Sequence, residues 1–366
     1  MRAGHILKET IQKVCLVFVG LAVALLSFEA FAWFAPRSWV PRPLRELGER
    51  MELSRRSDTF FIPDSELLFK IPPNTDFVVK HPDYTVRFKT NLNLKDIGFR
   101  GGTLGGPPWG AAVGDSFTFG QGVEQEETWA ALLAKSLGHD VINFGIPAQG
   151  PAQYTRVLKR YALPMHPRIA FYGFYFNDLD SAARFRRLKR RFPVSRYLRY
   201  YSYVYNLIGQ STSPLQPQPA LVKADAGEMS LDAEGLRRTL ERQNRTFDDR
   251  WALTSREIDD GIQASKDAGV IFVLFYFPSR WEIYWDLVKK QGNLPDSLDI
   301  DRLRRTVVQY CKTKKVLCLD LTPSLKREAS QGKQLYFPID GHWNREGNRI
   351  VAEAIREFLV GKGVVG

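Results

Sequence analysis

The run AAVGDSFTFG at residues 111–120 is a short apolar strand that ends in a Gly-Asp-Ser turn, and the recurrence of this pattern decides the fold. Further apolar runs follow at Val141–Phe144, Arg168–Phe176, Val270–Phe277 and Val316–Leu321. The segments between the runs resemble helices, one ended by Gly138 and another opened by Pro151. Continuous apolar strands that alternate with helices predict a mostly parallel sheet covered on both faces. We therefore expect a three-layer α/β/α domain.

Composition restricts the class of protein. The chain has 366 residues, of which 44% are hydrophobic and 25% charged, which excludes a wholly disordered chain, a collagen-like repeat and a multispan transporter. An excess of 52 Lys and Arg over 40 Asp and Glu gives a net charge of +12 and favours an anionic partner. Of three cysteines, Cys15 lies in an apolar run. Cys311 and Cys318 can pair only in an oxidising compartment, and we expect two free or buried thiols.

The N-terminal segment, residues 1–36, is expected to be a membrane anchor. Residues 14–34 are apolar apart from Glu29 and have about the 20 residues that cross a bilayer. A cleaved signal peptide is the alternative, because Ala30-Phe31-Ala32 has the form of a cleavage site. We favour a retained anchor, because the apolar character continues beyond that site. Basic residues flank the span on both sides, so the positive-inside rule gives nearly a tie for its orientation.

The rest of the chain is divided as follows. Residues 37–110 are expected to form a polar stalk and a small β appendage, because short alternating segments are broken there by Pro and Asn. Residues 111–366 are expected to form the α/β domain, with an insertion at about 184–230. The middle of this insertion, Gly209–Gly227, is rich in Pro, Gln and Ser and predicts a flexible surface loop.

Residues suited to acyl transfer follow the predicted strands. In an open α/β sheet, sites form beyond the carboxyl ends of the strands. Three strands lead into Gly114-Asp115-Ser116, Asn143–Gly150 and Phe176-Asn177-Asp178, and the last helix follows Asp340-Gly341-His342-Trp343. A serine, the amides of a Gly-rich turn, a carboxamide and an Asp–His pair supply a nucleophile, oxyanion donors, an orienting acid and a base.

The order and surroundings of these blocks resemble the SGNH/GDSL hydrolase superfamily, in its membrane-anchored bacterial form. The stretch NLKDIGFRG at Asn93–Gly101 resembles a lead-in seen in such members. In the last block the acid stands two residues before His342 rather than three, where Ile339 lies, and this form is similar to the alginate O-acetyltransferase-like branch. In an extended segment residues two apart face the same side, so we expect Asp340 to reach His342.

This resemblance implies an SGNH, flavodoxin-like fold and a serine mechanism. His342 takes the proton of Ser116 as it attacks an ester carbonyl, and Asp340 orients the imidazole. The implied oxyanion donors are the amide of Ser116, one amide from the turn and the side chain of Asn177. The family commonly has glycine where Ala148 stands, so the second donor stays open among Gly145, Ala148 and Gly150. No cofactor is implied, and the other histidines form no metal-ligand pair.

A basic and aromatic stretch follows Asn177, without any acid between Ser181 and Gln210. One interpretation is a helix with a solvated basic face whose tyrosines pack on the body. The other is a lid that binds an anionic glycan or anionic lipid. The candidate substrate-binding residues are Arg186, Arg187, Arg190 and Arg191.

We therefore expect a serine esterase or O-acyltransferase that acts on an acylated or acidic polysaccharide of the cell envelope or for export. It is expected to be a single-pass protein of the bacterial inner membrane, with its catalytic domain in the periplasm. A membrane acyl-donor protein is a further candidate partner, and nucleic acid is not expected. Two alternatives stay open: a non-catalytic glycan-binding or assembly protein that retains the fold, and a lysophospholipase-type lipid esterase.

Overall fold

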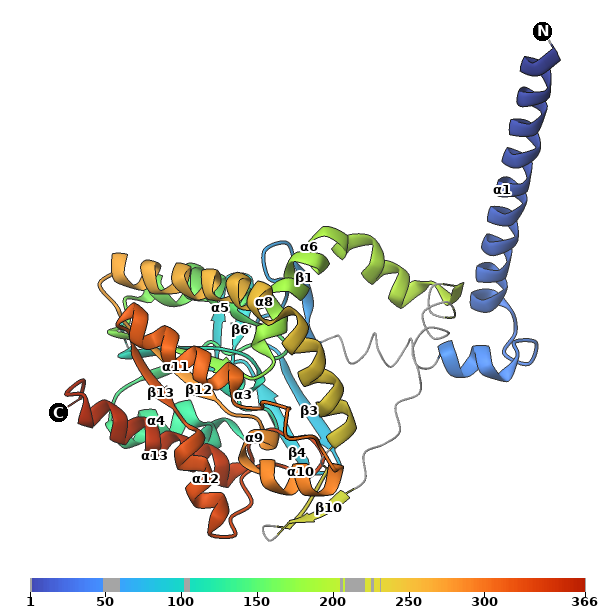
Figure 1. The fold of residues 1–366 in the computed structure, drawn as a ribbon. Helices are drawn as coiled ribbons and strands as arrows, with labels where there is room; N and C mark the ends of the chain where they lie inside the picture. Colours follow the sequence, from blue (N-terminus) through green and yellow to red (C-terminus); the bar gives the residue numbers. More distant parts are fainter. Residues whose placement is uncertain are drawn as a thin grey trace. The chain divides into compact units, whose positions relative to one another are not determined.

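A computed structural model describes residues 2–48, 60–101, 106–204, 207, 221–224, 227–230 and 232–365 (Figure 1). The chain divides into two compact units. One comprises Met1–Phe60 and Arg191–Pro217, and the other comprises Phe61–Arg190 and Gln218–Gly366. The domain boundaries expected at residues 36 and 110 stay predictions.

A five-stranded parallel sheet forms the centre of the second unit. Its strands are β7 (Gly110–Val113), β8 (Val141–Asn143), β9 (Ile169–Tyr175), β12 (Ile271–Phe277) and β13 (Leu317–Asp320). They lie in the order β13-β12-β9-β7-β8, and every neighbouring pair is parallel. This is the flavodoxin-like order, in which ligands bind at the switch point, here between β7 and β9.

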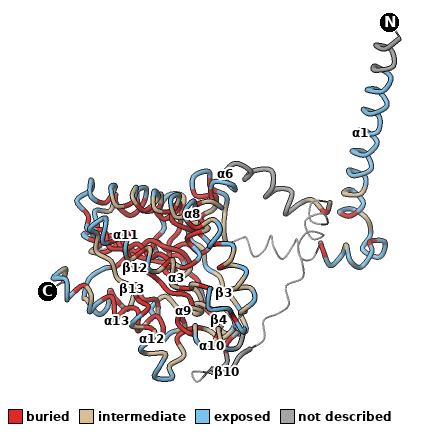
Figure 2. Tube along the Cα trace, in the orientation of Figure 1, coloured by how far each residue is buried: buried red, intermediate tan, exposed pale blue. Residues whose placement is uncertain are grey.

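Helices cover both faces of this sheet (Figure 1). One layer holds α5 (Pro151–Val157), α8 (Ala233–Asp267) and α11 (Arg302–Lys314). The other holds α4 (Trp129–Leu137), α12 (Thr322–Ser330) and α13 (Arg345–Gly361). Figure 2 shows the buried strands between the two layers. Because both faces are covered, β9 is buried at every position but its last and its sequence does not alternate. The expected three-layer α/β/α fold is confirmed.

The other helical elements beyond β7 are short, apart from the 24-residue α6. They are α3 (Ser116–Phe119), the 3-10 turns Gln125–Glu127 and Leu163–Met165, the π-helical Leu158–Ala162, α6 (Asp178–Tyr201), α9 (Arg280–Ile283) and α10 (Trp285–Gly292). The helix expected to begin at Glu126 starts as a 3-10 turn, and α4 follows because the Thr128 side chain caps it by accepting from the Ala131 amide at 3.3 Å.

Three antiparallel hairpins precede the sheet. They are β1–β2 (Ile62–Asp64, Leu68–Lys70), β3–β4 (Asp76–His81, Tyr84–Lys89) and β5–β6 (Leu92–Leu94, Ile97–Phe99). The insertion contains a further hairpin, β10–β11 (Leu221–Ala224, Gly227–Ser230). Most of the loop expected over Gly209–Gly227 lies outside the described residues, and its described part, β10, is a strand.

The first unit contains α1 (Arg2–Phe34), in which Glu9–Phe34 is long and apolar enough to span a membrane, with a mean hydropathy of 2.4. Residues 42–48 of the expected stalk are helical, and residues 49–59 lie outside the described part. Ala32, Leu47 and Tyr203 form a buried cluster. The Glu29 carboxylate accepts hydrogen bonds from Ser202 Oγ (2.5 Å) and from the amides of Tyr203 and Val204 (both 3.0 Å), so the one acid of the apolar run binds another segment of its unit.

The expectation of free thiols at Cys311 and Cys318 is wrong, because the structure joins them in a disulfide. Cys311 lies in the last turn of α11 and Cys318 lies in β13, the strand that this helix leads into and packs against. The tight turn between the two elements places the Cα atoms 6.0 Å apart, within the range that a disulfide spans. Cys15 is a free, exposed cysteine.

This pairing predicts the thiol count of the whole protein. Denatured without reductant, the chain should react with one equivalent of a thiol reagent, at Cys15, and after reduction with three. Peptide mapping of the unreduced sample should recover Cys311 and Cys318 in one cross-linked peptide. Three reactive thiols before reduction, in protein exported to an oxidising compartment, would contradict the pairing.

Candidate active site

Ser116 lies where strand β7 turns into the short helix α3. The strand ends at Val113, and after Gly114 the Asp115 carboxylate caps the helix by accepting from the Phe117 amide at 2.9 Å. Ser116 is the first helical residue, so its amide points out of the helix N-terminus without an intrahelical partner. Its side chain is partly exposed, whereas Asp115 and Phe117 are buried. The hydroxyl is therefore held at the carboxyl edge of the sheet, beside the switch point.

His342 reaches Ser116 from the end of the chain. Its Nε2 lies 2.7 Å from Ser116 Oγ, and its Nδ1 is hydrogen-bonded to Asp340 Oδ1. The Phe337 amide donates to the His342 carbonyl at 2.8 Å, which fixes the short loop that carries the imidazole. The ring also packs against Phe117, with centroids 4.8 Å apart. The structure thus places the three predicted triad residues in one hydrogen-bonded chain, and their catalytic role stays a prediction.

Asp340 reaches His342 through a turn rather than the extended segment that we expected. Gly341 has a φ of 84°, in the left-handed region that favours glycine. Asp340 Oδ1 accepts from the His342 amide at 3.1 Å, so the acid bonds to the backbone two residues on, as in an Asx-turn. The same oxygen then meets the imidazole. An acid two residues before the histidine can therefore reach the imidazole, because its carboxylate also forms the hydrogen bond that stabilises the turn between them.

The other oxygen of Asp340 is held by residues that the sequence analysis missed. Tyr84 Oη donates to Asp340 Oδ2 at 2.8 Å, and Gln121 Nε2 donates at 3.3 Å. Burial alone would raise the pKa of Asp340, but the hydrogen bonds and charge of His342 and the hydrogen bond from Tyr84 outweigh burial and lower it. Asp340 is therefore a carboxylate throughout the neutral range. No motif identified Tyr84, which lies in the appendage.

The candidate oxyanion donors flank Ser116 on both sides, because β7 lies between β8 and β9. Asn177 is exposed directly beyond the end of β9. Of the three candidate amides beyond β8, that of Gly145 donates to Asn143 Oδ1 (2.9 Å) and that of Gly150 to Gln153 Oε1 (3.2 Å). Ala148 is exposed with a φ of 62°, and within the described chain its amide has no hydrogen-bond acceptor. Ala148 is thus the candidate whose donor is available.

The turn that carries Asn177 is fixed by the buried Asp178. Its carboxylate accepts from the Tyr175 amide at 2.9 Å and from Tyr154 Oη at 3.0 Å. Burial, together with the nearby Asp115, raises the pKa of Asp178. These contacts give Asp178 a structural role and leave the side chain of Asn177 facing outward.

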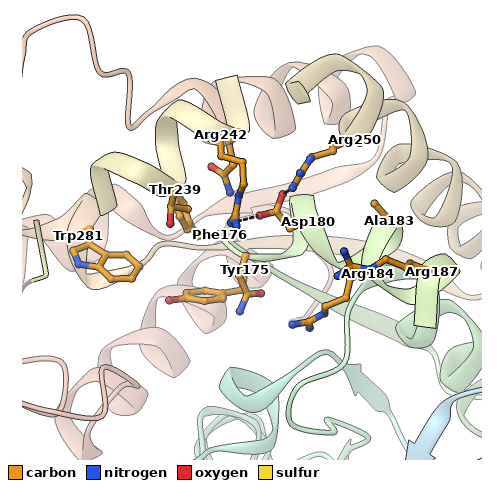
Figure 3. Close-up of a pocket in the computed structure, with 12 residues that line it drawn as sticks. Tyr175, Phe176, Asp180, Ala183, Arg184, Arg187, Thr239, Arg242, Arg250 and Trp281 are labelled. Atoms are coloured by element: carbon orange, nitrogen blue, oxygen red, sulfur yellow. Dashed lines mark hydrogen bonds and ion pairs between the residues drawn. The ribbon is translucent and has the colours of Figure 1, made fainter. Parts of the chain in front are cut away.

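A pocket of about 690 Å³ opens beside Asn177 (Figure 3). Aromatic side chains, including Tyr175 and Trp281, and amides contribute to its lining. Four arginines also line it: Arg184 and Arg187 from α6, and Arg242 and Arg250 from α8. Figure 3 shows Arg242 and Arg250 directed at Asp180, with Arg242 at 3.1 Å. Arg184 donates to the Ala148 carbonyl at 3.4 Å, which links the pocket to the turn beyond β8.

Of the four predicted substrate-binding arginines, Arg187 lines this pocket. Arg186 instead approaches Glu257, at 3.9 Å. Successive residues of an α-helix point about 100° apart, so the side chains of Arg186 and Arg187 diverge. The side chains of Arg190 and Arg191 lie outside the described part. Arg242 and Arg250 were missed, because α8 lies far along the sequence and carries no motif.

Arg100, from the lead-in NLKDIGFRG, binds the C-terminal end of α3, the helix that begins at Ser116. It is 1% exposed, and its guanidinium donates to the carbonyls of Phe119 (3.1 Å), Gly120 (2.5 Å) and Val123. Burial lowers its pKa to about 10, so it remains a cation at neutral pH. These carbonyls follow the last turn of α3, where a helix has acceptors without partners. The lead-in therefore supports the segment that holds Ser116.

Part of the chain matches a known family model. Residues 237–364 match the family model described as SGNH hydrolase-like domain, acetyltransferase AlgX, a range that includes Asp340 and His342 but not Ser116. The resemblance to the SGNH hydrolases is confirmed. The chain thus has the fold of the SGNH-like esterases and acyltransferases. No curated protein matches it significantly in sequence.

Several solved structures resemble the SGNH-like chain. An acetyl xylan esterase, AlAXEase, is 13% identical, with a TM-score of 0.39, over 68% of this chain and 98% of its own. A catalytic mutant of the acetylxylan esterase Axe2 from Geobacillus stearothermophilus is 13% identical, with a TM-score of 0.36, over 70% and 95%. The salicylyl-acyltransferase SsfX3 from a tetracycline biosynthetic pathway is 15% identical, with a TM-score of 0.36, over 72% and 57%.

The buried contacts of Arg100 predict its effect on stability. Arg100→Met should lower the free energy of unfolding by about 3 kcal/mol, because it leaves buried carbonyls without donors. Urea denaturation followed by circular dichroism measures this change. Arg87→Met is the matched control, since Arg87 is exposed and pairs with Asp76 at the surface at 2.7 Å; it should change stability little. Equal effects of the two substitutions would contradict the role of Arg100.

Proposed function

We propose that the SGNH-like chain is a serine esterase or O-acyltransferase that acts on ester groups of a cell-envelope or exported polysaccharide. The observation that carries this proposal is the hydrogen-bonded chain from Asp340 through His342 to Ser116, with Nε2 and Oγ 2.7 Å apart. A nucleophile, a base within hydrogen-bond distance and an acid that orients the base are what nucleophilic acyl transfer needs. A non-catalytic protein that retains the fold has no need of this alignment.

The proposed reaction has two halves. His342 Nε2 removes the Ser116 proton while Oγ attacks the ester carbonyl, and the Asp340 carboxylate stabilises the resulting imidazolium. The oxyanion accepts from the Ser116 amide, the Ala148 amide and the Asn177 side chain. The alcohol leaves with the proton from His342, which creates an acyl-enzyme. Water or a sugar hydroxyl then attacks this ester and gives its proton to His342, which passes the proton to Ser116 Oγ as the acyl group leaves.

The pocket beside Asn177 supports an acidic glycan as the substrate. Guanidinium groups bind carboxylates and sulfates through parallel hydrogen bonds, and aromatic rings such as Trp281 present an apolar face to a sugar. Asp180 engages Arg242 and Arg250, which leaves Arg184 and Arg187 as the cations for a ligand. Such a pocket suits an anionic sugar better than a long acyl chain.

We propose further that α1 is retained as an anchor, with the catalytic domain in the periplasm. Ala32, the last residue of the candidate cleavage site, is buried against Leu47 and Tyr203, and Glu29 binds residues 202–204. The segment therefore has a structural role in its unit, which supports retention. The disulfide between Cys311 and Cys318 supports an oxidising compartment.

Replacement of the nucleophile is the direct test of the enzyme. Wild-type protein should hydrolyse a small aryl acetate, and Ser116→Ala should lower kcat by at least about 10³-fold with the fold intact, because the attacking oxygen is gone. Ser136→Ala, whose hydroxyl donates to the Leu133 carbonyl in α4, is the control and should retain activity. Equal inactivity of wild type and Ser116→Ala, with glycan binding retained, would favour the non-catalytic alternative. A strong preference for long acyl chains would favour the lipid esterase.

The two sides of α6 provide a matched test of the substrate. The double variant Arg184→Gln/Arg187→Gln should raise KM for an acidic acetylated polysaccharide about 10-fold or more at low salt and change KM for a neutral aryl acetate little. Arg186→Gln, on the side of the helix that faces Glu257, should leave both values near wild type. Added salt should raise KM for the acidic polysaccharide more in wild type than in the double variant. Equal KM values for the acidic polymer in wild type and double variant would discard the acidic glycan.

A further inference from the structure

The hairpin β3–β4, which precedes the strands of the parallel sheet in the sequence, reaches the proposed active site. Its turn, Pro82-Asp83, leads into Tyr84, whose hydroxyl donates to Asp340 Oδ2 at 2.8 Å although the two residues are 256 positions apart. Asp83 Oδ2 accepts from the amides of Ile339 and Asp340, each at 2.8 Å. Two successive residues of the hairpin thus bind the loop that carries the acid through their side chains: Tyr84 binds the Asp340 carboxylate, and Asp83 binds two backbone amides.

The position of Asp340 depends on these contacts. Oδ1 serves both the amide and the ring of His342, so bonds to Oδ2 are needed to stop the carboxylate from rotating. The Asp340 side chain is only 8% exposed, so solvent cannot supply all of these partners. The donors present are Tyr84 at 2.8 Å and Gln121 at 3.3 Å, and the shorter bond is that of Tyr84.

Tyr84 is itself held rigidly. Its ring stacks on His81, with centroids 4.8 Å apart, and packs against Phe337 at 4.9 Å. Gly122 leaves room for the ring, because a Cβ there would lie 2.9 Å from Tyr84 Cε1. Burial, followed by the charge of Asp340, raises the pKa of Tyr84 well above its ordinary value, so the hydroxyl remains a donor. A locked ring presents its hydroxyl at a fixed point.

We propose that Tyr84, supported by Asp83, is a positioning residue that holds Asp340 for His342, so that the β3–β4 hairpin completes the active site. This inference rests on the proposed serine mechanism. Asp83 and Tyr84 contact the loop that carries the acid, whereas further along the hairpin Phe88 packs on Phe119 of α3, with centroids 5.1 Å apart.

Removal of the Tyr84 hydroxyl has two consequences for the triad. The carboxylate loses a restraint, so fewer molecules hold the imidazole in line with Ser116. The charge of Asp340 is also less dispersed, so it stabilises the imidazolium more strongly. Other charged or titratable groups also face Asp340 and His342. They are Asp83, His81, Asp115 and Arg280. None of them is changed by Tyr84→Phe, so the change in rate and in pH profile is assigned to the lost hydroxyl.

The test compares Tyr84→Phe with wild type in the full chain, with a small aryl acetate as substrate. We expect kcat to fall about 10-fold with KM within about twofold, because a hydrogen bond to a charged group is lost away from the substrate. The acid limb of kcat/KM should move to higher pH. Tyr161→Phe is the control, since it removes a buried hydroxyl that has no hydrogen-bond partner among the described residues, and it should match wild type.

Two further measurements separate positioning from general damage. In an Asp340→Asn background, Tyr84→Phe should cause no further loss, because its target is already altered. The low-field proton NMR signal of the His342 Nδ1–H should be present in wild type, move in Tyr84→Phe and stay unchanged in Tyr161→Phe. An unchanged kcat, or a lower kcat with an unmoved acid limb and unmoved NMR signal, would overturn the proposal. If wild type shows no Ser116-dependent activity but the NMR signal still responds to Tyr84→Phe, the serine mechanism fails while the positioning contact stands.

Discussion

The hydrogen bond between Ser116 Oγ and His342 Nε2, at 2.7 Å, is the contact on which the proposed chemistry depends. Two features of the fold bring these atoms together. The parallel order β13-β12-β9-β7-β8 places the end of β7 at the switch point, and the loop before α13 brings the imidazole to that edge. Helix capping by Asp115 fixes one partner, and the Asx-turn of Asp340 fixes the other.

Much of the fold could be predicted from the sequence, because burial leaves a strong local signal. Strands β9 and β12 are covered on both faces, so their sequences are continuous apolar runs bounded by turn residues. The four blocks also indicated which strand ends would carry polar groups. Element boundaries were less accurate where a side chain decided them, as at Thr128, which separates a 3-10 turn from α4.

The rest depends on contacts between residues far apart in the sequence. The sequence presented Asp340 and His342 as a pair, but not Tyr84, since no local pattern links a hairpin turn to a loop 256 residues later. Arg242 and Arg250 enter the pocket only through the packing of α8 against the start of α6, where both pair with Asp180. The disulfide was missed for a different reason, because these two cysteines, seven residues apart, approach through the sharp turn from a helix into a strand.

The wide separation of the site's parts has a consequence for the making of the protein. A ribosome produces the hairpin and Ser116 well before the stretch that contains Asp340 and His342, since His342 lies 226 residues after the serine. A nascent polypeptide that is truncated before this stretch has the serine but no base to activate it. Reactivity toward esters would therefore arise only after this stretch has been translated, and shorter nascent chains would lack it.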